Sequence, residues 1–163
     1  MHKNHSNMSD MSDDHDRHYR HLLIMAVLSF IAMYILMYAM VNVIGNVYNN
    51  FNQFYMAGLM TAPMVLIELT VMRAIYQNKQ RNALIIAASV IAALMFFSLI
   101  RQQTAISDKQ FLRSMIPHHA GAILMCEQAS IQDTEIKALC GTIISGQQAE
   151  IDQMKAKLLE LEK

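Results

Sequence analysis

LLIMAVLSFIAMYILMYAMVNVI, the stretch from Leu22 to Ile44, is apolar except for one Ser and one Asn. Two further runs, Phe54 to Met72 and Ala83 to Ile100, have a similar composition, and Glu68 is the one charged residue within them. A membrane-spanning helix needs about 20 apolar residues. Because these runs are apolar on every side rather than along one face, they predict three transmembrane helices in a lipid bilayer.

The composition supports an all-α membrane protein. Hydrophobic residues make up 54% of the 163 residues and charged residues only 16%, with two Pro and five Gly. The formal net charge is zero, which gives no electrostatic basis for nucleic-acid binding. No catalytic triad, phosphate-binding loop or paired-carboxylate site stands out, so we do not expect an enzyme.

The distribution of Lys and Arg predicts the orientation of the spans. Residues 45–53, between the first two runs, contain no Lys or Arg, whereas Arg73, Lys79 and Arg81 lie between the second and third. The positive-inside rule then places the N-terminus in the cytoplasm of the inner (plasma) membrane and everything after Ile100 in the periplasm.

Three parts follow. Residues 1–20 form a cytoplasmic tail rich in His and Met, which we expect to be disordered. Residues 21–100 form the membrane domain, with helices at about 22–44, 54–77 and 83–100. Residues 101–163 form a periplasmic helical domain.

The periplasmic domain is predicted to be an antiparallel helical hairpin. Ser107, followed by Gln110, fits a capping box at the start of its first helix. Asp133 is the expected N-cap of a second helix, from Thr134 toward Leu161. Pro117 predicts a kink inside the first helix. A two-helix hairpin buries little surface, so we expect it either to pair with a second copy in a four-helix bundle or to dock on the membrane domain.

Soft metal ligands gather on this hairpin. Met115 and His119 share a narrow face of the first helix with Cys126, and His118 and Met125 flank it. Thioether and thiolate groups favour Cu(I), and imidazole also accepts Cu(II). The predicted metal ligands are Met115, His118, His119, Met125 and Met154. Met residues at helical spacing are equally compatible with simple core packing.

Cys126 and Cys140 each lie seven residues from Asp133. In a hairpin that turns at Asp133, the two residues lie opposite each other at the same distance from the turn. A disulfide is expected outside the cytoplasm, and a reduced thiol pair that assists Cu(I) binding is the alternative.

Other residues are weaker metal candidates. His2 and His5 belong to the His-rich tail, a type of segment that often binds metal weakly. Met60 and Met64 lie on one face of the second span, and Glu68 follows Met64 by one turn on the same face. An ionisable group within a membrane is a functional candidate by default. The stripe therefore predicts either a Cu(I) path or plain helix packing, with Glu68 paired to Arg73.

The string Asp108-x-x-Phe111-Leu112-x-x-Met115-Ile116-Pro117-His118-His119-x-x-Ala122-Ile123-x-Met125, followed by Gln147-x-x-Glu150-Ile151-x-x-Met154, resembles a known family. It is similar to the family catalogued as domain of unknown function 305, which includes CopM-like periplasmic copper-binding proteins. The resemblance covers residues 107–158. It implies a ferritin-like helical bundle and supports the same five residues as copper ligands.

We therefore expect a membrane-anchored periplasmic protein that binds copper, as Cu(I), with Ag(I) or Cu(II) as further ions. It would act as a metal buffer or chaperone in copper tolerance and metal homeostasis. We expect it to be a homo-oligomer and to interact with other periplasmic copper-handling proteins. Two alternatives remain: a structural or interaction subunit that binds no metal, and a component of a Cu(I) transporter.

Overall fold

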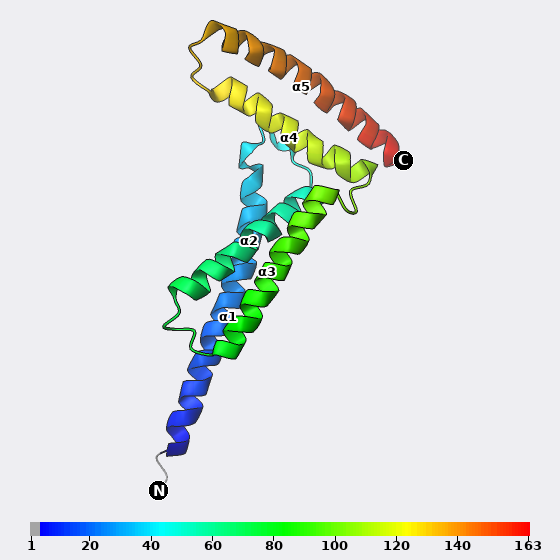
Figure 1. Cartoon of the computed structure of the whole chain (residues 1–163). Helices are drawn as coiled ribbons and strands as arrows, with labels where there is room; N and C mark the ends of the chain where they lie inside the picture. Colours follow the sequence, from blue (N-terminus) through cyan, green and yellow to red (C-terminus); the bar gives the residue numbers. More distant parts are fainter. Residues whose placement is uncertain (1–3) are drawn as a thin grey trace. The chain divides into compact units, whose positions relative to one another are not determined.

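The computed structural model describes the backbone of residues 4–163 and the side chains of residues 16–163, and this part of the chain is helical with no strands. The helices, shown in Figure 1, are α1 (Asn4–Leu36), the short 3-10 helices η1 (Met37–Met40) and η2 (Ile44–Asn46), α2 (Phe51–Val71), α3 (Lys79–Gln102), α4 (Asp108–Gln128) and α5 (Thr134–Leu161). The predicted all-α fold is thus confirmed.

The chain divides into two compact units. The membrane unit comprises the chain up to Tyr34 together with Tyr55–Gln102, and the hairpin unit comprises Ile35–Phe54 and Gln103–Lys163. Asp16–Met40, Phe51–Val71 and Lys79–Gln102 are each long and apolar enough to cross a membrane. These are the three apolar runs that the sequence predicts as spans.

The composition predicts a disordered N-terminal tail, but from Asn4 onward its backbone is helical and belongs to α1. The Tyr19 hydroxyl donates a hydrogen bond to Asn82 Oδ1 at 2.7 Å. Arg81 pairs with Asp16 and also lies over the Tyr19 ring, 5.5 Å from its centroid. These contacts with the start of α3 hold the last residues of the tail in a helix. His2 lies outside the described residues, and so does the side chain of His5.

The first span ends its α-helix earlier than the predicted boundary at Ile44. α1 stops at Leu36, η1 follows, and Val41 and Val43 have extended backbone angles. Residues 41–45 combine β-branched residues with Asn and Gly, all of which are weak helix formers. Asn46 Nδ2 donates to Asn42 Oδ1 at 2.8 Å across this bend.

The other two spans also shift by a few residues. α2 ends at Val71 rather than near residue 77, and residues 72–75 form a turn. α3 begins at Lys79, before the expected residue 83, because Asn78 Oδ1 accepts a hydrogen bond from the backbone N–H of Arg81 at 3.0 Å. Such a cap satisfies a free N–H at the helix start.

Gly58 allows α2 and α3 to approach closely inside the membrane unit. A Cβ atom at this position would overlap the ring of Phe96. We therefore expect Gly58→Val to destabilise the membrane unit by about 1–3 kcal/mol through overpacking. Thermal unfolding in detergent measures the effect. Gly45→Ala is the control because nothing lies within 4 Å of its Cβ position. Equal midpoints for the two variants would contradict the prediction.

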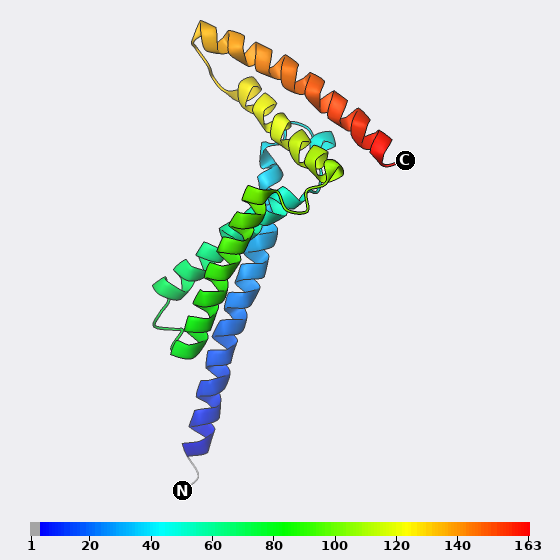
Figure 2. The same ribbon diagram turned by 45° about the vertical axis from the view of Figure 1, so that its right-hand side comes forward.

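The hairpin unit contains α4 and α5 side by side, as Figure 2 shows from a second angle. Its core consists of five buried residues, Ile116, Ala120, Ile123, Ile151 and Leu158. Asp133 caps α5 as predicted, accepting hydrogen bonds from the N–H groups of Glu135 and Ile136. Ser107 is the N-cap of α4, but its side chain makes no capping hydrogen bond. The predicted capping box does not close, since Gln110 Oε1 accepts from the N–H of Phe51 at 3.1 Å instead.

The segment between the first two spans covers part of α4. Val41 and Tyr48 pack against the hairpin core, and Asn52 Nδ2 donates to Ser114 Oγ at 3.2 Å. A Cβ atom on Gly121 would lie 3.5 Å from the carbonyl oxygen of Met40. The hairpin therefore buries more surface than two helices alone provide.

Candidate metal site on the hairpin

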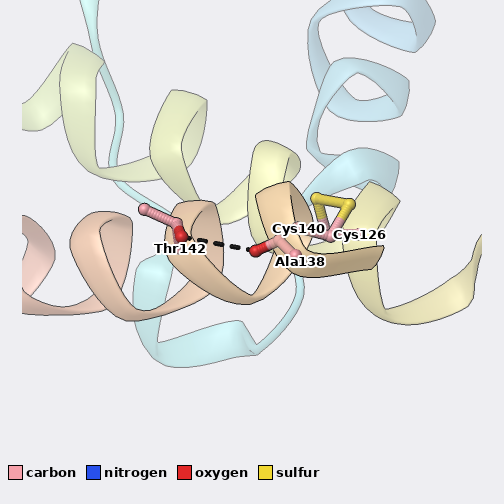
Figure 3. The surroundings of a disulfide bond; sticks show 4 residues. All are labelled: Cys126, Ala138, Cys140 and Thr142. Carbon is pink, nitrogen blue, oxygen red and sulfur yellow. Dashed lines mark hydrogen bonds between the residues drawn. A yellow bond between two sulfur atoms is a disulfide. The ribbon is translucent and has the colours of Figure 1, made fainter. Parts of the chain in front are cut away.

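A disulfide between Cys126 and Cys140 joins α4 and α5 near the turn of the hairpin, as Figure 3 shows. The two Cα atoms are 5.3 Å apart, which is typical of disulfides. Of the two states left open by the sequence, the structure has the disulfide. The sulfur atoms are bonded to each other and are not available as thiolate ligands.

A second link between the helices joins His119 and Glu150. His119 is buried, with 9% of its surface exposed. Its Nε2 lies 2.7 Å from Glu150 Oε2, and its Nδ1 lies 2.9 Å from the carbonyl oxygen of Met115. Both ring nitrogens are thus engaged. The predicted ligand His119 takes part in holding α4 to α5 in this arrangement.

Met115 and Met154 lie one helical turn from the His119–Glu150 pair, on the side away from the hairpin turn. Met115 precedes His119 by four residues, and Met154 follows Glu150 by four. Because α4 and α5 run antiparallel, moving four residues in opposite directions from a linked pair reaches the same level on both helices. Both side chains are half-buried, and Met154 packs against the hairpin core. Two thioether-bearing residues thus lie at one level of the two helices, one turn from the His119–Glu150 pair.

His118 and Met125 lie on the exposed side of α4. The His118 ring centroid is 6.1 Å from that of His119, so His118 belongs to the same neighbourhood. Met125 is 54% exposed and follows His118 by seven residues. That spacing is about 10 Å along a helix axis. Helix geometry therefore separates Met125 from the other four predicted ligands of the hairpin.

Glu150 is the residue that the sequence reasoning quoted but did not place in the site. Its position in Gln147-x-x-Glu150, one turn before Met154, is the signal that could have drawn attention to it. Gln147 Nε2 also lies 3.5 Å from Glu150 Oε2. No group of three or more His, Cys, Asp or Glu side chains in the described part gathers as a metal site. A metal site on the hairpin therefore depends on the Met residues.

The candidates in the membrane unit differ in exposure. Met60 is 45% exposed on α2, while Met64 is half-buried. The Tyr76 hydroxyl, just after α2, hydrogen-bonds to Glu68. Burial and the nearby Glu68 carboxylate raise the pKa of the Tyr76 hydroxyl above its ordinary value. The hydrogen-bonding partner of Glu68 is thus a tyrosine that the sequence did not single out for this role.

Comparison with known proteins places the chain in a family. The family model described as domain of unknown function (DUF305) matches residues 68–158, more than half of the chain. The match begins in α2, so it reaches well beyond residues 107–158, where the sequence motifs lie. The uncharacterized protein L153 of Acanthamoeba polyphaga mimivirus is 37% identical over 109 residues, which cover 66% of this chain and 70% of that protein. No solved structure matches the chain. The chain belongs to the family of the domain of unknown function 305.

Proposed function

We propose that the protein is a membrane-anchored metal-binding protein whose hairpin takes up Cu(I). The observation that carries the proposal is the placement of Met115 and Met154 at one level of the two helices, beside His118 and His119. Two thioethers and an imidazole match the preference of Cu(I) for soft ligands, and Ag(I) has the same preference. We place Met115, Met154 and a histidine on the ion, and Met125 outside it.

The disulfide supports a location of the hairpin outside the cytoplasm. Disulfides persist in oxidising compartments and are rare in the cytosol, where thiols are kept reduced. The distribution of Lys and Arg around the three spans predicts the same side of the membrane for the hairpin. On this proposal the hairpin faces the periplasm of a bacterial cell, and the three spans hold it at the inner membrane. Its activity is to buffer or pass on copper rather than to catalyse a reaction.

A structural or interaction subunit is the second candidate function. It is favoured by the hydrogen bonds at both nitrogens of His119, which give this residue a role without metal. The hairpin also exposes apolar side chains, among them Phe111 at 51% and Leu139 at 57%. These are suited to contact with a second copy of the chain. A transporter is less favoured, because Met60 faces outward and a Met-lined path would require several chains.

Metal titration of the full chain in detergent tests the proposal. We expect one hairpin site for Cu(I), kept reduced with ascorbate, or for Ag(I). Met115→Leu combined with Met154→Leu should weaken binding by about tenfold or more, since the volume is preserved while both thioethers are lost. Met95→Leu on α3 is the control, because it removes an exposed thioether in the membrane unit. Equal affinities for the wild type and the double variant would rule out this Cu(I) site.

A further inference from the structure

The two ring nitrogens of His119 are not equivalent. Nδ1 faces the carbonyl oxygen of Met115, which can only accept a hydrogen bond. Nδ1 therefore carries a hydrogen that stays engaged with this carbonyl. Nε2 faces the Glu150 carboxylate, which also accepts, so a metal ion that binds Nε2 would replace the hydrogen shared with Glu150. Metal-binding histidines commonly have this arrangement, in which one N–H is held by a carbonyl or carboxylate and the other nitrogen binds the metal.

The Glu150 carboxylate is hydrogen-bonded to that second nitrogen, Nε2. Its Oε2 lies 2.7 Å from His119 Nε2. The Glu150 side chain is 56% exposed and the His119 side chain 11% exposed. The carboxylate is thus the solvent-exposed partner of a buried ring. An ion that binds His119 at Nε2 must therefore either displace the Glu150 carboxylate or accept it as a second ligand.

We propose that Glu150 is a specificity-determining residue of the hairpin metal site. This inference rests on the proposed function. A divalent ion such as Zn(II) can bind the imidazole and keep the carboxylate as an oxygen ligand, because Zn(II) accepts both types. Cu(I) and Ag(I) prefer thioether and imidazole, so for them the carboxylate is a competitor at Nε2. Glu150 thereby shifts the balance toward divalent ions, and Met115 and Met154 shift it toward monovalent soft ions.

The test compares Ag(I) and Zn(II) binding by the full chain in detergent and its Glu150→Gln variant. The ratio of Ag(I) to Zn(II) affinity is expected to rise by about tenfold or more in the variant, as is typical for loss of a metal-linked carboxylate. A ratio is the right measure because general loosening of the hairpin weakens both ions together. Asp152→Asn removes the same charge from an exposed position two residues away on α5 and should leave the ratio unchanged.

A double-variant comparison keeps the test independent of the stability of any one protein. If His119 and Glu150 share the divalent ion, then His119→Ala already loses the Zn(II) binding that Glu150→Gln loses. Combining them should add little, whereas independent residues would give the sum of the two losses. An unchanged or lower Ag(I) to Zn(II) ratio in Glu150→Gln, with Ag(I) still bound by the wild type, would overturn this inference alone. No Ag(I) binding by the wild type would overturn the proposed function together with it.

Discussion

Replacing Ile151 with Ala is expected to destabilise the hairpin unit by about 2–5 kcal/mol. Ile151 lies on α5 and is fully buried, with 0% of its surface exposed, in the cluster that includes Ile116 and Ile123 of α4. Removing its outer carbons leaves a cavity that the disulfide-linked helices cannot easily close. Hydrogen–deuterium exchange of α4 and α5 amides in the full chain measures the local free energy of opening directly.

Leu159→Ala is the matched control for that experiment. Leu159 is on the same helix but is 65% exposed, so its replacement should change the opening free energy by no more than about 0.5 kcal/mol. Similar losses for both variants would mean that the α4–α5 contact contributes little to the stability of the unit. The buried pairing of these helices would then be wrong.

The spans could be predicted because their signal is local. Length and apolar composition identify a membrane helix without knowledge of its neighbours. Their boundaries depend on contacts between residues distant in sequence. The bond from Tyr19 to Asn82 extends the helical region into the expected tail, and composition alone does not reveal it.

The hairpin shows the same division between local and long-range information. The turn at Asp133 fixed the register, and the register placed Cys126 opposite Cys140. Helical spacing and the motif resemblance both selected His119 as a ligand, but its hydrogen bond to Glu150 requires knowing which side of α4 faces α5. The packing of Tyr48 on the hairpin core was also missed, because residues 41–53 have no helical periodicity to read.

Opening the Cys126–Cys140 disulfide is the other change with a large expected effect. The bond joins residues 14 apart in sequence, and closing a loop of that size stabilises a fold by about 3 kcal/mol in the chain-entropy view. A dithiol reductant should therefore accelerate exchange of α4 and α5 amides by roughly two orders of magnitude, at 1.4 kcal/mol per tenfold. The membrane unit contains no cysteine, so amides of α3 are an internal reference that should not respond.

The Cys126→Ala, Cys140→Ala double variant separates loss of the cross-link from other effects of the reductant. It should exchange as fast as the reduced wild type and show no further change when the reductant is added. A reductant effect that persists in the double variant would trace the loosening to another cause. Unchanged exchange after complete reduction, verified by thiol counting, would mean that the hydrophobic core and the His119–Glu150 link already hold the helices together. In that case the hairpin would also be stably folded in a reducing compartment. The disulfide would then give little support to a periplasmic location.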